Sequence, residues 1–468
     1  MTDSSGMSAA KRALLAQWRE GRVPTTPTGI TAGPPASRAR ASMQQKELWD
    51  LHRRNTDTSS SNISFAALID AEVDAGALAG AVDLLARRHE TLRTTLSVDR
   101  VVWQDIHDEP LLRLETIDLT DVPPDAAQAR AIELANELAA QPFDITTPPL
   151  ARAVLYRLGP GQSLLAVVAS HVVADGWSLA IAMQETTRLY DSLIEGATPD
   201  LPPLPAQYRD YAAWQWRWMD SPAAREHARY WEKRLRPISA TRLPVDRPRG
   251  DAPDLRAGTV RIELTSELSA AARRLAQAEQ ASLFTVLLTA FMMLLRERTG
   301  DPLVSVAAPM ASRPDPLTHP MIGFFASVVP LCTTINGDET FRTVLSRVRT
   351  VANEAQAHQD FALPMYLNLV EPDRDFVSSP MYTANFVLQP PMQPFKLAGT
   401  HLESVTLDRA EMLSSFAIHL WNSEPRIHGT VCYARSAFLE STIGAIVARY
   451  LTILERVTDD PDTRVDAV

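Results

Sequence analysis

A histidine and an aspartate stand four residues apart at a predicted junction between a strand and a helix. Residues 164–169 form a short, continuous apolar run with β-branched members, which predicts a buried strand. His171 follows this run, Asp175 comes four residues later, and Ser178 is the predicted N-cap of a helix over residues 179–193. A histidine at the end of a strand is both accessible and rigidly held, as a proton-handling or orienting group must be.

This spacing alone does not separate a functional histidine from a structural one. A single histidine and aspartate four residues apart occur by chance in many chains, and a hydrogen-bonded structural histidine is the simpler interpretation. Other features of the sequence are therefore needed to distinguish a functional from a structural His171.

The composition narrows the class of protein. A chain of 468 residues predicts two domains of roughly 200 residues each. The net charge of -10 and the lack of a basic run disfavour nucleic acid and anionic membranes as partners. No signal core, membrane-length apolar run or metal-ligand spacing is visible, so we expect a cytoplasmic protein without a metal site.

Strands and helices are mixed along the chain. Residues 1–41 are rich in Ser, Thr, Pro, Gly and Ala and predict a leading helix, over residues 9–20, and a flexible linker. Strand-like and helix-like stretches then alternate, which predicts an α/β fold. The predicted strands cover residues 65–69, 101–107, 111–117, 151–158, 163–169, 259–264, 303–308, 328–335, 382–389 and 428–433, and the predicted helices cover residues 75–89, 123–140, 208–234, 266–277, 283–298 and 441–458.

The motif around His171 resembles the HHxxxDG signature of the condensation domains of nonribosomal peptide synthetases. Residues 170–177 read SHVVADGW, and further blocks of the family occur in the same order. They are SMQQKELW at 42–49 (family SxxQxRLW), RHETLRT at 88–94, YRDYAAW at 208–214, LPVDRPR at 243–249, IGFF at 322–325, HQDFALP at 358–364 and a last block within 374–381. The resemblance runs from about residue 42 to residue 460.

The resemblance implies two lobes, each similar to a chloramphenicol acetyltransferase subunit, in a V-shaped pseudo-dimer with a central tunnel. It places one lobe at residues 42–237, a crossover at 238–258 and the second lobe at 259–468, with His171 midway along the tunnel. Peptidyl or acyl carrier proteins would deliver phosphopantetheine arms, so the chain itself needs no bound cofactor. The family also implies a monomer.

The resemblance assigns roles to individual residues. His171 becomes the catalytic group, while Asp175 forms a structural ion pair, with Arg313 as the first candidate partner and Arg93 as the second. Gly176 is expected to serve the backbone conformation or a close approach of substrate. The candidates for lining the tunnel are Trp177, Phe325 and Ser327.

Two departures from the family pattern matter. Ser170 replaces the first motif histidine; because neighbouring side chains of a strand point to opposite faces, we expect Ser170 to face the packing and His171 the tunnel. Ala326 and Ser327 stand where the family usually has Val-Asn, which indicates an unusual donor or acceptor.

Three functions remain open on this basis. The first is a free-standing condensation enzyme that transfers the acyl group of a carrier-bound thioester to an amine. Such an enzyme could instead be one domain of a larger synthetase. The second is an ester-forming acyltransferase with an alcohol acceptor. The third is a catalytically retired domain that binds carriers or recruits a tailoring enzyme; the retained His171 and Gly176 argue against it.

Overall fold

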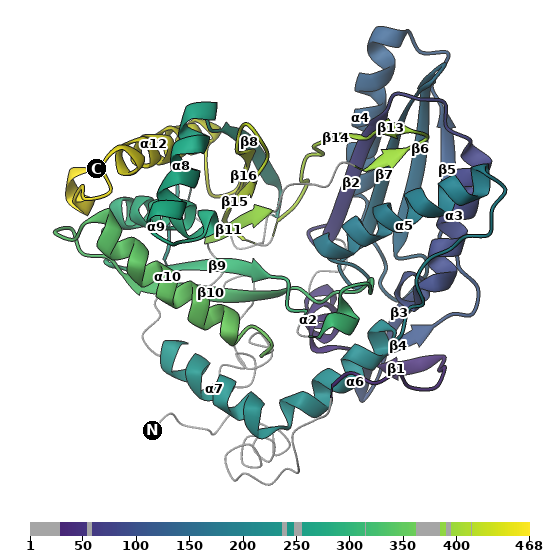
Figure 1. Cartoon of the computed structure of the whole chain (residues 1–468), viewed down its shortest axis with the longest axis horizontal. Coiled ribbons are helices and arrows are strands. Elements are labelled where there is room, and N and C mark those ends of the chain that lie inside the picture. The colour runs from purple at the N-terminus through teal and green to yellow at the C-terminus, as the bar shows by residue number, and fades with distance from the viewer. Residues whose placement is uncertain are drawn as a thin grey trace. The chain divides into compact units, whose positions relative to one another are not determined.

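The computed structural model describes residues 29–53, 59–235, 241–247, 255–313, 315–361, 384–389, 395–412 and 414–468. It divides into two compact units (Figure 1). Unit 1 consists of Met1–Arg225, Ala311–Ala326 and Gln393–Ala410, and unit 2 of Glu226–Met310, Ser327–Met392 and Glu411–Val468. Both units combine strands and helices, which confirms the predicted α/β class. The predicted lobe boundaries remain predictions.

Within the described residues, the main sheet of unit 1 has five strands in the order β14-β2-β7-β6-β5. Only β5 and β6 run parallel; the other neighbours are antiparallel. A smaller antiparallel sheet has the order β1-β4-β3. The strands are β1 (Arg38–Arg40), β2 (Asn62–Ile69), β3 (Thr94–Asp99), β4 (Val101–Ile106), β5 (Leu114–Asp118), β6 (Ala151–Gly159), β7 (Gln162–Ser170), β12 (Lys396–Leu397), β13 (Thr400–His401) and β14 (Glu403–Val405).

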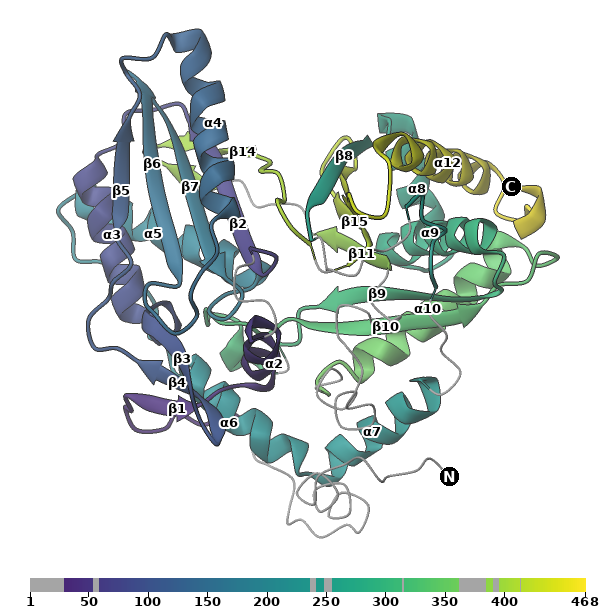
Figure 2. The ribbon, with the colours of Figure 1, turned by 180° about the vertical axis from the view of Figure 1, so that it is seen from behind.

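Helices cover both faces of the five-stranded sheet. Figure 1 shows α3 and α5 on one face, and Figure 2, from behind, shows α4 on the other. The helix α4 presents Ala127, Ala131 and Ala135 to the sheet, so small residues let it pack closely. The helices of this unit are α2 (Met43–His52), α3 (Ala75–Arg88), α4 (Pro124–Ala140), α5 (Gly176–Ile194) and α6 (Tyr208–Met219), with short 3₁₀ turns at Glu90–Arg93 and Pro316–Thr318.

Unit 2 is built on a sheet whose described strands have the order β10-β9-β11-β15-β16-β8. Helix α9 contacts α8, α10 and α12, and its residues from Thr285 to Leu295 are all buried, so it forms the centre of the helical layer. The elements are β8 (Ala257–Glu263), α8 (Ser266–Ala278), α9 (Leu283–Thr299), β9 (Leu303–Met310), β10 (Ser327–Thr334), α10 (Phe341–Ala357), β11 (Ala384–Gln389), β15 (Phe416–Trp421), β16 (His428–Ala434), α12 (Glu440–Asp459) and a 3₁₀ turn at Val465–Ala467.

The long helix predicted over residues 208–234 is in fact two helices. Helix α6 ends at Met219, and α7 (Pro222–Leu235) begins at a proline. Proline has no backbone N–H and fits the first turn of a helix, so it starts a new helix here instead of continuing the old one. The predicted leading helix at residues 9–20, much of the crossover and the last family block at 374–381 lie outside the described residues.

No single helix in the described ranges has both the length and the apolar composition needed to span a bilayer, although α8 and α9, bent by 107°, meet that test as a pair.

Candidate active site

The predicted strand-to-helix junction is present in unit 1. Strand β7 ends at Ser170, and α5 begins at Gly176. The N-cap of α5 is Asp175, whose Oδ1 accepts hydrogen bonds from the backbone N (2.8 Å) and the Oγ (2.7 Å) of Ser178. This corrects the prediction of Ser178 as N-cap, because the helix starts one turn earlier and the aspartate satisfies its free N–H groups.

The hydrogen bonds of His171 fix its tautomer. Its backbone N donates to the carbonyl of Ser61 (2.9 Å), which ties the loop to β2. The ring Nδ1 lies 3.0 Å from the carbonyl oxygen of Ala174. A carbonyl oxygen only accepts, so Nδ1 carries the hydrogen and Nε2 keeps its lone pair. The ring is further held by Phe324, at a centroid distance of 4.9 Å.

The surroundings of His171 keep the imidazole neutral. Burial, and secondly the positive charge of Arg409, lower its pKa to about 4; Asp175 and the bond to Ala174 act in the opposite direction. The residue keeps part of its surface exposed, so a reacting group can reach it. At neutral pH the protein therefore holds a base whose Nε2 lone pair has no hydrogen-bond partner among the described residues.

Asp175 pairs with Arg313, the first of its two candidate partners. Its Oδ1 lies 3.1 Å from Nη2 of Arg313, and the two side chains are 3% and 2% exposed. The guanidinium also donates to the carbonyls of Thr318 and Met321 (2.9 Å for Met321) and lies over the ring of Phe325. The second candidate, Arg93, donates to the carbonyl of His107 instead.

The same aspartate binds the segment Ala311–Ala326 to the motif. Its Oδ2 accepts hydrogen bonds from the backbone N of Phe325 (3.1 Å) and of Ala326 (3.3 Å). The Oγ of Ser178 accepts a hydrogen bond from the backbone N of Gly323 (3.0 Å) and lies 2.8 Å from its carbonyl oxygen. Asp175 is thus fully occupied by protein groups, so its role is to hold the loop of His171 in place.

Two of the family blocks brace this segment from the other side. Thr91 of the RHETLRT block donates to the carbonyl of Ile322 (2.8 Å), and His89 bonds to Glu185 on α5 (2.8 Å). Tyr208, the first residue of the YRDYAAW block, donates to the carbonyl of Phe324 (2.5 Å). In unit 1 these blocks therefore hold the segment that binds the motif around His171.

Gly323 is a sensitive point in this bracing. A Cβ added there would lie 2.1 Å from Cδ2 of Tyr208, a fully buried ring that is held by its hydroxyl. We expect Gly323→Ala to lower the free energy of unfolding by about 1–3 kcal/mol, the usual cost of overpacking, as measured by urea denaturation. Gly159→Ala is the control, because its added Cβ meets nothing within 4 Å among the described residues; equal effects of the two changes would contradict the prediction.

The remaining predicted residues have mixed outcomes. Ser170 is buried and its Oγ accepts a hydrogen bond from the N of Val172 (3.3 Å). Phe325 is completely buried against Tyr208, Tyr211 and Arg313, so it does not line an open space, which corrects its assignment to the tunnel.

Three further residues were named from the resemblance. Trp177 is 47% exposed and its Nε1 donates to the carbonyl of His319 (3.2 Å). Gly176 has no positive φ, and no described atom lies within 4 Å of an added Cβ, so only the close approach of substrate remains as its predicted role. Ser327 is the first residue of β10 in unit 2 and is buried.

Sequence reasoning missed the roles of three residues at this site. Ser178 links Asp175, Arg313 and Gly323 through one hydroxyl, the ring of Phe324 packs at a tilt against His171, and Arg409 lowers the pKa of His171. Phe324 lies within a matched block and offered a signal; Arg409 lies 238 residues after His171 and offered none. Among the residues that the structure places, no group of three or more His, Cys, Asp or Glu could hold a metal ion.

Comparison with solved structures shows which known domains share this fold. The X-domain from teicoplanin biosynthesis is 26% identical, with a TM-score of 0.83 over 94% of this chain and 99% of that domain. The first condensation domain of the calcium-dependent antibiotic synthetase has a TM-score of 0.79 over 92% of this chain and 99% of that domain. At 18% identity, the second likeness shows the fold alone.

Comparison with curated proteins and family models shows the family. A linear gramicidin synthase of Brevibacillus parabrevis is 34% identical over 432 residues, which are 90% of this chain and 8% of that protein. Chondramide synthase of Chondromyces crocatus is 31% identical over 428 residues, 91% of this chain and 11% of that protein. The chain thus spans only a small part of these relatives. Since the model of the condensation domain matches residues 37–468, the protein belongs to the condensation domain family of nonribosomal peptide synthetases.

Proposed function

We propose that this protein transfers an acyl group from the thioester of a carrier protein to an amine and so forms an amide. The observation that carries the proposal is the state of His171: Nδ1 is bonded to Ala174, Nε2 is free, and a pKa of about 4 keeps the ring neutral. Family membership supports the reaction class.

The chemistry follows from that free lone pair. When the amine attacks the thioester carbonyl, a C–N bond forms and the nitrogen becomes positively charged. Nε2 of His171 accepts the excess proton, the C–S bond breaks, and the proton passes to the departing thiolate. Holding both reactants beside His171 supplies most of the acceleration, since well-oriented reactants avoid about 7–11 kcal/mol of entropic and solvent-reorganisation cost.

Carrier-protein-bound substrates are part of the proposal. The phosphopantetheine arm of an acyl carrier protein would bring the donor, and the acceptor would be a second carrier-bound or a free amine. Action as a free-standing enzyme stays a prediction.

A second candidate is the recruitment of a tailoring enzyme. It is favoured by the likeness to the teicoplanin X-domain, a domain whose structure is also known in complex with OxyB. The neutral, half-exposed His171 and its intact loop favour transfer over recruitment.

The test is an acyl-transfer assay read by intact-protein mass spectrometry. Acyl-loaded carrier proteins, including the native partners, are mixed with the protein and a panel of amine and alcohol acceptors. Loss of the acyl mass with formation of an amide supports the proposal, and an ester product would replace it with the alcohol-acceptor alternative. Carrier binding without transfer to any acceptor would overturn it in favour of recruitment.

A further inference from the structure

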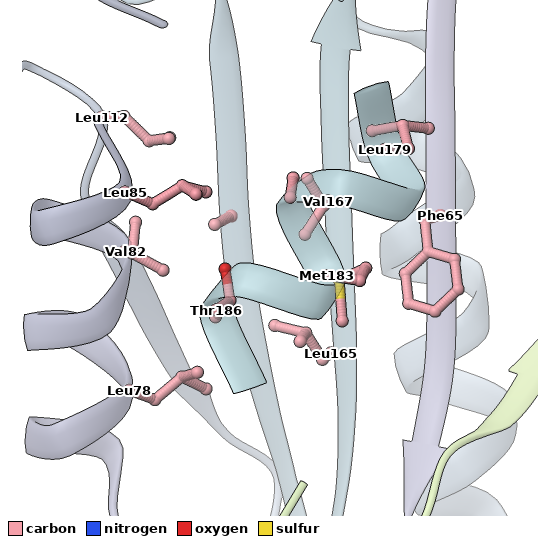
Figure 3. A pocket seen from close by; sticks show the side chains of 12 residues that line it. Phe65, Leu78, Val82, Leu85, Leu112, Leu165, Val167, Leu179, Met183 and Thr186 are labelled. Atoms are coloured by element: carbon pink, nitrogen blue, oxygen red, sulfur yellow. The ribbon is translucent and has the colours of Figure 1, made fainter. Parts of the chain in front are cut away.

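An apolar cavity of about 40 Å³ lies inside unit 1, under the helix that begins at the motif. It is enclosed by strands β2, β6 and β7 and by helices α3 and α5 (Figure 3). Thr186 is the only polar residue among the twelve that line it. A cavity with such walls offers nothing to hydrogen-bond a polar ligand and is suited to a hydrocarbon group.

The two ends of the cavity differ. At one end Phe65, Val167 and Leu179 are half-exposed, as is Ala182 on α5. At the other end the leucines of α3 are buried, and Figure 3 shows Leu78 and Leu85 facing the cavity opposite Phe65. The cavity wall is therefore only partly buried on the side of β2 and α5, where the ring of Phe395 packs edge-on against Phe65 at a centroid distance of 6.3 Å, and it is closed at α3.

The partly buried end lies near His171. Leu179 is three residues after Gly176, about 5 Å along the helix axis. Val167 is four residues before His171, about 13 Å along the strand direction. Between them Gly176 is exposed and contributes no side chain, so the start of α5 leaves room for a chain that passes from His171 towards Leu179.

We propose that this cavity binds the end of an unbranched aliphatic acyl chain on the donor thioester. The inference rests on the proposed function, because it names the class of donor for the same site. With the carbonyl at His171, the chain must span about 13 Å to reach Val167, a distance greater than the length of an extended decanoyl chain, which selects long chains over acetyl. A volume about a quarter of the roughly 150 Å³ that holds benzene admits a few carbon atoms of a chain end, and not a ring.

One side chain of the cavity wall can adjust its conformation to a bound acyl chain. Met183 lines the cavity, and its unbranched side chain with three rotatable bonds can move aside without leaving a polar gap. Each methylene that enters such a site strengthens binding about fourfold. The affinity for a donor should therefore rise steeply once its chain is long enough to reach the cavity.

The experiment measures binding by titration calorimetry. The probes are acetyl-, octanoyl- and tetradecanoyl-pantetheine in which an amide replaces the thioester, so that nothing is transferred. We expect the wild-type protein to bind the tetradecanoyl probe at least tenfold more tightly than the octanoyl probe. In Ala182→Leu, where three carbon atoms occupy the cavity, the affinity for the tetradecanoyl probe should fall on the order of 50-fold.

Matched variants complete the test. Ala180→Leu adds the same side chain on the exposed face of α5 and should bind the tetradecanoyl probe like the wild type. Thr186→Leu fills the cavity from the next turn of the same helix and provides a second variant if Ala182→Leu does not fold. Affinities that do not depend on chain length, or a preference for tetradecanoyl that both filled variants retain, would overturn the proposal. The probes measure binding alone. Absence of acyl transfer in the separate assay would therefore contradict the proposed function, whereas the binding titration tests the acyl-chain cavity independently.

Discussion

We expect replacement of His171 by alanine to slow acyl transfer by about 10²–10⁴-fold, the usual contribution of a positioned general base. The variant loses the only group that we assign to the proton of the attacking nitrogen. Its fold should persist, because among the described residues the partly exposed ring makes one hydrogen bond and one aromatic contact, which a mutation can remove at modest cost. The measurement is the single-turnover rate of acyl loss from a loaded carrier.

Ser170→Ala is the matched control for this experiment. Ser170 is adjacent in the chain, but it is buried, and its hydroxyl oxygen accepts the N–H of Val172. We expect its rate to stay within a few-fold of the wild type. A His171→Ala rate within tenfold of the wild type would contradict the assignment of His171 as the base and would leave positioning without proton transfer to His171.

Asp175→Ala should lower the free energy of unfolding by about 3–5 kcal/mol, as expected when one partner of a buried ion pair is removed. The change leaves the buried guanidinium of Arg313 without its carboxylate and also frees the N–H groups of Phe325 and Ala326. The measurement is equilibrium denaturation in urea, followed by tryptophan fluorescence and circular dichroism.

An exposed ion pair in the same unit provides the control. Glu133 pairs with Arg130 on α4, and both side chains are largely in solvent. Glu133→Ala should therefore cost less than 1 kcal/mol. An equally small cost for Asp175→Ala would show that the aspartate does not hold the loop, and any accompanying loss of activity would then point to a direct role.

The local part of the site could be predicted from the sequence. The apolar run, His171, Asp175 and the following helical pattern lie within about thirty residues, and local periodicity determines such a junction. The misplaced N-cap shows the limit of this reasoning, since Asp175 and Ser178 are both good capping residues and only the start of the helix decides between them.

The long-range part of the site could not be derived in the same way. Arg313 is 138 residues from Asp175 and was identified through the family resemblance. Phe325 was expected to be accessible, but Tyr208 and Tyr211 enclose it from a helix more than a hundred residues earlier. Burial of this kind depends on tertiary packing, which spacing along the chain does not reveal.

Some secondary-structure elements were not predicted, although the sequence contains the apolar pattern that indicates them. Helix α10 carries Phe341, Val344, Leu345 and Val348 at helical spacing, and β15 is a six-residue apolar strand. The interruption between α6 and α7 was also visible as Pro222, but the continuous aromatic pattern of the stretch concealed it.

The central claim, that the fold presents a neutral His171 with a free Nε2, is tested most directly by nuclear magnetic resonance of the protein labelled with ¹⁵N-histidine. Assignment uses His171→Gln, and Arg409→Gln should raise the measured pKa because it removes a nearby positive charge. The account predicts an Nδ1–H tautomer that stays neutral from pH 8 to about pH 5 and is protonated only near pH 4. A midpoint near the ordinary histidine value of about 6.5, or an Nε2–H tautomer, would contradict it.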